Sequence, residues 1–335
     1  MNAKERVFAR IEGKPVDRVP NTNIIMMLAA KEIGVKYSEY VNDHRLLVKG
    51  NIACAEKYSL DIVTTMSDPM REAHDVGTDV VFPEDDVPYP EKVLLQDAAD
   101  LLKLKVVKPE DGERMTESVN AIKLYKEQLG DEFPVTGWVE GCFAEAADLR
   151  GVNEFMMDLM DEDGFVTDLL DFCLEQATIY AQAQVDAGAD IIGVGDAIAS
   201  VTGPVIYSST AVKYETELFK RIKAMGARIK LHICGNITPF IDVIPVDLID
   251  ILDVDWMNPI EKARAACEGS CAFAGNYDPV ADLLQSYPEQ IEKKVAGLIE
   301  TCGSRYITSA GCEVPRDTPE ENLLAVARAV ERLSF

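Results

Sequence analysis

Both the fold and the chemistry of the chain can be inferred from the stretch Ala227-Arg228-Ile229-Lys230-Leu231-His232-Ile233-Cys234-Gly235-Asn236. Its alternation of apolar and polar residues predicts a β-strand over residues 227–233. Side chains two positions apart on a strand point to the same side, so His232 and Cys234 share a face at the carboxyl end. An imidazole and a thiol aimed at one point suit Zn²⁺, but two ligands do not complete a site.

A third candidate ligand follows far downstream. Residues 305–311 form another apolar run that predicts a buried strand, with Cys312 at its carboxyl end. If both strands belong to one parallel barrel, their carboxyl ends meet at the same rim and the three side chains converge. A Cys₂His set leaves one zinc position open, which is typical of a catalytic zinc. The alternative is a core histidine beside two inert buried thiols.

Short β-rich runs alternate with longer helical patterns, which indicates a parallel sheet with crossover helices. About eight strands are predicted, the number that closes a (β/α)₈ TIM barrel. They lie near residues 18–25, 61–66, 134–140, 189–194, 227–233, 248–254, 271–274 and 305–309. Helical patterns cover residues 113–129 and 163–186, and a final helix begins near Thr318.

The length and the composition fit one domain over residues 1–335. A chain of 335 residues that is 47% hydrophobic can bury the core of a barrel with an insertion. Residues 70–112 are interpreted as that insertion, which follows the second strand and is expected to contain a hairpin. On a barrel this is the active-site face, where an insertion forms a lid or wall. A surface elaboration without chemistry explains it equally well.

The net charge and the cysteine content argue against several classes of ligand and of protein. The net charge of −25 argues against nucleic acid, anionic membranes and heavily carboxylated substrates. The eight cysteines include no CxxC pair and are too sparse for a disulfide scaffold. No apolar signal region precedes them, and no apolar run is long enough to span a membrane. We therefore expect a cytoplasmic protein whose cysteines are thiols or ligands.

Three further motifs together resemble the uroporphyrinogen decarboxylase superfamily. They are Gly275-Asn276-Tyr277-Asp278-Pro279, the pair Asp255-Trp256, and the pattern from Gly311 through Pro315 and Thr318-Pro319 to Asn322. The resemblance runs nearly end to end and implies a TIM barrel, in agreement with the strand count. The superfamily contains two chemistries, porphyrinogen decarboxylation and corrinoid-dependent methyl transfer.

Two departures weaken the alternative of a uroporphyrinogen decarboxylase, a lyase of haem biosynthesis. The decarboxylases bind the substrate carboxylates with an arginine-rich segment after the first strand, but no arginine lies between Arg18 and Arg45 here. They also carry a histidine where this chain has Cys312. The methyltransferase branch has a zinc motif of His-x-Cys followed far downstream by Cys, which His232, Cys234 and Cys312 match.

The resemblance therefore implies a zinc-dependent methyltransferase. It would move a methyl group between a methylcobalamin-type corrinoid and a small-molecule acceptor or donor, with zinc activating a thiol or equivalent nucleophile. The direction of transfer stays open. The chain has no Asp-x-His-x-x-Gly motif, so we expect the corrinoid on a separate partner protein that docks at the barrel mouth. A non-catalytic partner of such a protein is a third possibility, and the oligomeric state is not indicated.

Other polar residues near strand ends are candidates for the site. Asp68 follows the second strand where the decarboxylases place a central aspartate, and we interpret it as a substrate or supporting residue. Glu140 is a candidate fourth zinc ligand or a partner that orients His232. Asp196 is a candidate of the same kind as Glu140, although each of these two carboxylates could instead cap the helix that follows it. The candidates for substrate contact are Met26, Asn276, which could instead shape its turn, and Asp278.

Overall fold

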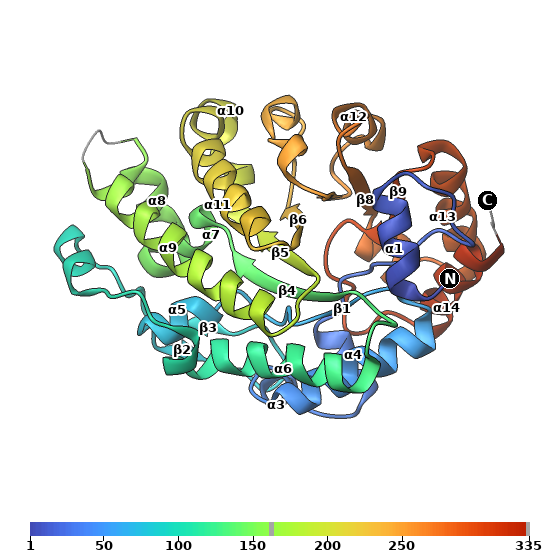
Figure 1. The fold of residues 1–335 in the computed structure, drawn as a ribbon, viewed down its shortest axis with the longest axis horizontal. Coiled ribbons are helices and arrows are strands. Elements are labelled where there is room, and N and C mark those ends of the chain that lie inside the picture. Colours follow the sequence, from blue (N-terminus) through green and yellow to red (C-terminus); the bar gives the residue numbers. More distant parts are fainter. Residues whose placement is uncertain (161–163, 333–335) are drawn as a thin grey trace.

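The computed structural model describes residues 1–160 and 164–332. Its main sheet has seven parallel strands in the order β1-β4-β5-β6-β7-β8-β9. These strands are β1 (Val63–Thr64), β4 (Val135–Glu140), β5 (Ile191–Gly195), β6 (Arg228–Ile233), β7 (Ile251–Val254), β8 (Ala272–Tyr277) and β9 (Tyr306–Ala310). The sheet curls and helices surround it (Figure 1). The predicted architecture is confirmed, with seven regular strands in place of eight.

The helices follow the crossover pattern that the sequence predicts. They are α1 (Ala3–Ile11), α2 (Met27–Glu32), α3 (Tyr37–Tyr40), α4 (His44–Tyr58), α5 (Arg71–Val76), α6 (Glu113–Leu129), α7 (Cys142–Arg150), α8 (Val152–Asp158), α9 (Phe165–Asp186), α10 (Gly203–Ile206), α11 (Val212–Ala224), α12 (Ile260–Ala266), α13 (Pro288–Cys302) and α14 (Glu320–Arg332). The start predicted for α9, residue 163, lies outside the described residues. None of the helices described is long and apolar enough to cross a membrane.

The prediction of a first strand at residues 18–25 is wrong, because this segment forms no regular strand. Only Asn21 forms an isolated parallel bridge, with Thr308 of β9. Pro20 has no N–H to donate, and the Asn21 side chain bonds to Tyr58 O and Asn23 instead of supporting a ladder. The segment still joins the two edges of the sheet. Thr22 N donates to Thr308 O, while Asn21 O accepts from Asp61 N just before β1.

Helix α1 packs across the amino-terminal ends of the strands. Its Val7 and Ile11 form a small core with residues at the starts of three strands, Ile191, Ile251 and Ala272. The Arg10 guanidinium also donates to Tyr306 O at 2.7 Å. Because α1 covers this end, the cavity of the barrel opens at the carboxyl ends of the strands.

Residues 70–112 follow β1 and form little regular structure. After α5 comes a short antiparallel hairpin of β2 (Val80–Val81) and β3 (Tyr89–Pro90). Asp85, in the hairpin loop, pairs with Arg316 at 3.1 Å. The hairpin therefore contacts the segment that follows Cys312, on the side of the barrel where the strands end.

Candidate metal centre

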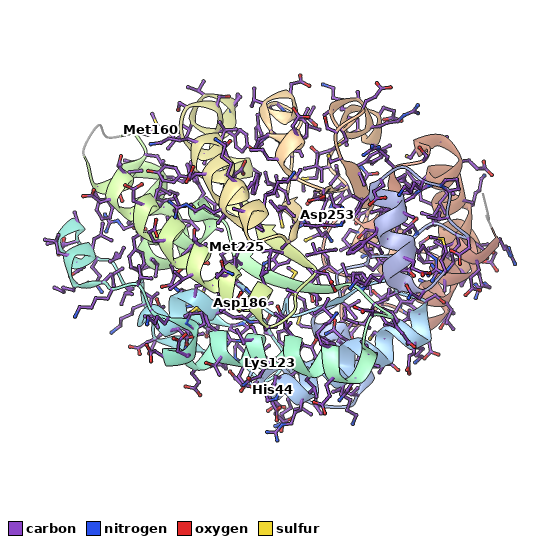
Figure 2. The ribbon with its side chains drawn as sticks, viewed as in Figure 1. His44, Lys123, Met160, Asp186, Met225 and Asp253 are labelled. Carbon is purple, nitrogen blue, oxygen red and sulfur yellow. The ribbon has the colours of Figure 1, made fainter. Side chains whose placement is uncertain are left out.

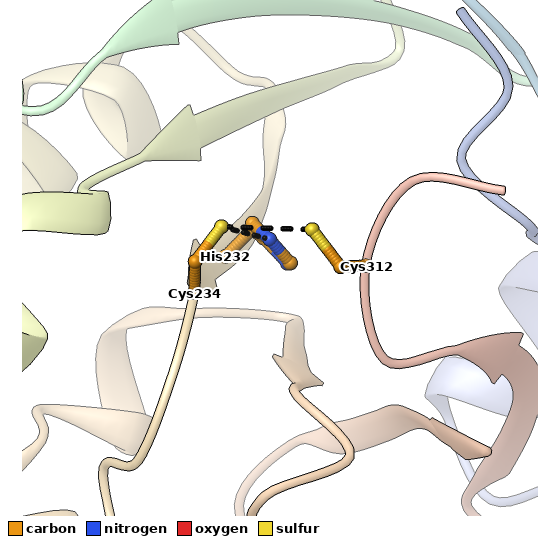
Figure 3. A group of neighbouring side chains, drawn as sticks. All are labelled: His232, Cys234 and Cys312. Carbon is orange, nitrogen blue, oxygen red and sulfur yellow. Dashed lines mark hydrogen bonds between the residues drawn. The ribbon is translucent and has the colours of Figure 1, made fainter. Parts of the chain in front are cut away.

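Three sulfur and nitrogen donors meet at the carboxyl ends of β6 and β9. His232 lies on β6, Cys234 follows that strand, and Cys312 follows β9. His232 Nε2 is 3.0 Å from Cys234 Sγ, and the two sulfurs are 3.8 Å apart (Figure 3). The donor atoms all lie within 4.8 Å of one another. The structure thus brings together the three residues that the sequence pattern singles out.

Glycine next to each cysteine allows the two loops to approach. A Cβ atom at Gly311 would lie 2.1 Å from Trp256 N, so only glycine fits where the chain turns toward Cys312. Gly235 has a φ of +89°, a left-handed conformation that favours glycine. Its N–H donates to Asp255 Oδ2 at 2.7 Å. Both cysteines are therefore held by backbone geometry as well as by their own contacts.

Asp253 orients the His232 ring. Its Oδ2 lies 3.1 Å from His232 Nδ1 and 2.8 Å from Lys230 Nζ. Burial lowers the pKa of His232, but the contacts with Asp253 and Cys312 outweigh it and raise the pKa to about 9. Asp253, marked in Figure 2, is fully buried in the interior of the molecule. A carboxylate that fixes one imidazole nitrogen leaves the other free to bind a metal.

The donor set fits a tetrahedral zinc. With Zn–S bonds of about 2.3 Å, a tetrahedral ion separates two sulfurs by roughly 3.8 Å, which is the distance between Cys234 and Cys312. The nitrogen–sulfur distance of 3.0 Å is about half an ångström shorter than this geometry needs. The hydrogen bond from Cys234 holds the pKa of the Cys312 thiol below its ordinary value. One thiolate is thus already favoured at the site.

A cavity of about 200 Å³ opens beside the three donors. Its lining includes three predicted site residues, Met26, Asp68 and Glu140, and one residue that the sequence reasoning missed, Glu313. The remaining lining residues, the three donors apart, are Ile24, Met66, Pro69, Trp138, Gly195 and Ala197. Most of the surface is apolar, so a bound molecule would lose water around its reacting atom.

Trp138 forms the wall of the cavity nearest to His232. The two ring centroids are 6.5 Å apart. A Cβ atom on Gly193 would lie 2.2 Å from the indole ring and one on Gly195 would lie 2.8 Å from it. The two glycines of β5 therefore make room for the ring, whose Nε1 donates to Glu140 at 3.1 Å.

Asp68 is paired, although it reaches the cavity. The Arg114 guanidinium donates to both of its oxygens at 2.7 Å. Burial raises the pKa of Asp68, but Arg114 outweighs burial and lowers it to about 2. Asp68 is therefore a carboxylate that is already neutralised by a buried cation from α6. A molecule bound in the cavity would therefore meet an Asp68 carboxylate whose charge is already balanced by Arg114.

The other predicted residues do not line the cavity. Asp196 is buried after β5 and accepts from Ala144 N at the start of α7, the capping role considered as its alternative. Asn276 donates to Asn258 O, and Asp278 accepts from Val280 N and Ala281 N at the start of a π-helical turn. The contacts of Asn276 and Asp278 hold the turns in which they lie.

Behind Glu140 lies a group of buried carboxyls. Glu140 N donates to Glu72 Oε1, and Glu145 and Asp148 of α7 lie close enough to act on both carboxyls. Burial first, and then the neighbouring acids, raise the pKa of Glu145 well above its ordinary value. Neither carboxyl oxygen of Glu145 has a hydrogen-bond partner among the described residues. In the folded protein, the neutral, protonated form of these carboxyls is therefore favoured over the charged form.

We expect the variant Glu145→Gln to gain stability relative to the parent protein as pH rises. A carboxyl whose pKa is higher in the folded than in the unfolded state binds more protons when the protein is folded. Its contribution to stability is therefore full below the unfolded pKa and is lost as pH rises through the folded pKa. The amide has no such proton, and the gain should reach about 1–3 kcal/mol between pH 5 and pH 8. Urea unfolding at the two pH values measures it. Glu56→Gln on the exposed face of α4 is the control, and an equal change there would contradict the expectation.

The chain is similar to known proteins over nearly its whole length. The family model for uroporphyrinogen decarboxylase (URO-D) matches residues 2–333. The methylcobamide:CoM methyltransferase MtbA of Methanosarcina mazei is 28% identical, over 99% of this chain and 98% of the relative. MtaA of Methanosarcina barkeri, with the same activity in its name, is 29% identical over 97% and 96%. A solved structure of a methyltransferase from Methanosarcina mazei superposes with a TM-score of 0.89, at 24% identity and 99% coverage of both chains.

Proposed function

The chain belongs to the uroporphyrinogen decarboxylase family, and we propose that within it the chain is a zinc-dependent methyltransferase that acts with a corrinoid protein and a small thiol. One observation carries the proposal, the convergence of His232, Cys234 and Cys312 within 4.8 Å. The similarity to methylcobamide:CoM methyltransferases supports the corrinoid as the methyl carrier. The proposed zinc ligands are these three residues, which leave a position for the substrate.

Zinc held by two thiolates and an imidazole would lower the pKa of an incoming thiol and keep its sulfur nucleophilic. Other residues of the chain orient the proposed ligands and shield the reacting sulfur from water. Asp253 fixes the ring of His232, and the apolar wall around Trp138 excludes water from the reacting sulfur. Cys312 and Cys234 enter as thiolates, so their negative charges balance the dication.

In the proposed direction, the methyl group would pass from the corrinoid to the thiol. The thiol would lose its proton to solvent, and its sulfur would attack the methyl carbon. A sulfur–carbon bond would form as the bond between the methyl carbon and the corrinoid breaks, and the electron pair of that bond would leave with the corrinoid, which is thereby reduced by two electrons. The products are a methyl thioether and the reduced corrinoid. The reverse reaction uses the same positions and would charge Co(I) from a methylated donor.

An apolar rim on the barrel mouth supports a protein as the methyl carrier. We define the rim as Val205 after β5, Trp256 and Met257 after β7, and Val280 after β8. All four are exposed, from 43% for Trp256 to 79% for Val205. Strand carboxyl ends share one face of the barrel, so the segments that carry these residues follow strands that end on the same face as the cavity. Exposed apolar side chains at such a place are typical of a docking surface.

We expect the variants Val205→Glu and Met257→Glu to lower kcat/KM for methyl transfer from the corrinoid protein by about tenfold. A carboxylate in an apolar interface has to be desolvated when the partner docks. Transfer from free methylcobalamin needs no docking and should stay unchanged. Leu102→Glu, on the 3₁₀ segment Ala98–Lys103, is the control. Equal losses with both methyl donors would contradict the docking role of the rim.

We expect Asp253→Asn to weaken zinc binding by about 10- to 100-fold, because the amide no longer fixes the His232 ring as an anion does. Competition with a chromophoric chelator measures the zinc affinity, and circular dichroism checks that the variant is folded. Asp250→Asn is the matched control, since Asp250 bonds to Arg228 and Ile229 N at the amino end of the same strand pair. Unchanged zinc affinity in Asp253→Asn would argue against the orienting role.

The experiment that tests the function is a methyl-transfer assay on metal-free and zinc-loaded protein, with methylcobalamin and a panel of acceptors. Zinc-dependent formation of a methyl thioether supports the proposal. The alternative, a uroporphyrinogen decarboxylase, has the family name in its favour but needs cations for the carboxylates of its substrate. Turnover of uroporphyrinogen by metal-free protein would establish that alternative and contradict ours.

A further inference from the structure

Among the described residues, those that line the cavity beside the three donors supply no cationic side chain other than His232. His232 is itself one of the three donors. Apart from the three donors and the paired Asp68, the ionisable groups in the lining are the carboxyls of Glu140 and Glu313. Neither carboxyl carries a positive charge that could balance an anion. The lining is otherwise apolar apart from the paired Asp68.

Two buried cations of the barrel, Arg114 and Lys230, are already paired with carboxylates. Arg114 donates to both oxygens of Asp68, and Lys230 lies 2.8 Å from Asp253. Arg71 donates to Ser67 Oγ, and its charge acts on the carboxyls of Asp68 and Glu72. Its Nη1 has no hydrogen-bond partner among the described residues, but Arg71 is not part of the cavity lining. An anion in the cavity would therefore meet no cationic side chain in the lining apart from His232, and recruiting Arg114 or Lys230 would break a buried ion pair.

The proposed metal does not supply the missing charge. Two thiolates from Cys234 and Cys312 would balance Zn²⁺, and the acceptor sulfur itself would add a further negative charge as it loses its proton. A second anionic group on the acceptor would then lie in an apolar space of about 200 Å³ next to Glu140 or Glu313. An ionised group placed in an apolar space without a cationic partner loses its hydration without compensation, so such an acceptor is disfavoured.

We propose that the methyl acceptor is a small thiol whose other atoms carry no negative charge, such as an alkyl or hydroxyalkyl thiol. Thiols that carry a sulfonate or a carboxylate are poor acceptors, and these include 2-mercaptoethanesulfonate, the compound known as coenzyme M. This inference rests on the proposed function and specifies the substrate of that same site. It also separates this chain from the relatives whose names specify CoM.

A matched series of thiols tests the inference on the zinc-loaded protein. The series comprises 2-mercaptoethanol, 2-mercaptoethanesulfonate, 3-mercaptopropionate and cysteamine, each with methylcobalamin as donor. We expect kcat/KM, corrected for the acidity of each thiol, to be at least about tenfold higher for 2-mercaptoethanol than for the two anionic thiols. Binding to Co²⁺-substituted protein, followed by its sulfur-to-metal absorption band, gives the same order without turnover.

A charge introduced into the cavity provides a second test. Met66→Lys places an unpaired cation in the lining, whereas Met66→Gln changes polarity alone. We expect the lysine variant to reduce the preference against the sulfonate by about tenfold and the glutamine variant to retain it. Equal or better use of anionic thiols by the unaltered protein overturns this inference alone. Failure to methylate any thiol contradicts the proposed function as well.

Discussion

Replacing Cys312 by alanine is expected to abolish stoichiometric zinc binding and to lower methyl transfer by about a thousandfold or more. The variant loses one of three donors and leaves His232 and Cys234, which belong to a single strand end. Two ligands do not hold zinc against competing chelators, because each missing bond removes a large part of the binding free energy. Elemental analysis of the dialysed protein and the rate of methyl transfer measure the two effects.

The matched control is Cys302→Ala, which removes a buried cysteine at the end of α13. It should keep full zinc content and activity. The same loss in both variants would show that a general effect on the fold, and not the missing ligand, is responsible. Full zinc content in Cys312→Ala would exclude Cys312 as a ligand and remove the main support for the proposed function.

Replacing Arg114 by methionine should destabilise the protein by about 3–5 kcal/mol at pH 7, because Asp68 is left as a buried carboxylate without its cation. The side chain of Asp68 is fully buried and that of Arg114 is 2% exposed, so water does not replace the lost partner. Urea unfolding at constant pH measures the change. The double variant Asp68→Leu with Arg114→Met should recover much of the loss, since no unpaired charge remains.

The pH dependence of this pair follows from the lowered pKa of Asp68. A carboxyl with a folded pKa of about 2 contributes stability that is fully present above its unfolded pKa and is lost as pH falls toward 2. In the parent protein this contribution is nearly constant between pH 7 and pH 4. The difference from Arg114→Met should shrink over that range, because Asp68 in the variant is buried without its cation and takes up a proton as pH falls. Arg221→Met, which removes a partly exposed ion pair with Glu175, should cost less than about 1 kcal/mol. An equal cost at both sites would contradict the role of burial.

The sequence pattern was sufficient for the sheet and for the three sulfur and nitrogen donors. The strands of a parallel sheet are buried on both faces and appear as apolar runs, and their carboxyl ends meet on one side. His232, Cys234 and Cys312 could therefore be brought together from spacing and strand ends alone. Residues 18–25 resembled a strand for the same reason, but bonds made by Asn21 and Asn23 side chains replace the ladder there.

The residues that support the site could not be found in the same way. Asp253 bonds to His232 because β6 and β7 are neighbours in a register that pairs these two residues, and a single sequence does not specify register. The one feature of the sequence that marks Asp253 is that it places a carboxylate in the middle of an apolar strand. Arg114 reaches Asp68 from a helix 46 positions later, and nothing local marks that pairing. Glu313 was missed although it follows Cys312 directly.

The packing of α1 across one end of the barrel has a consequence for the order of events in turnover. With that end covered, the proposed acceptor and methyl carrier would share one entrance to the cavity. A docked carrier would then lie over the newly formed thioether, which would leave only after the carrier has dissociated. At saturating acceptor, the exchange of one carrier molecule for the next would set the pace of the cycle, and added viscogen would slow it.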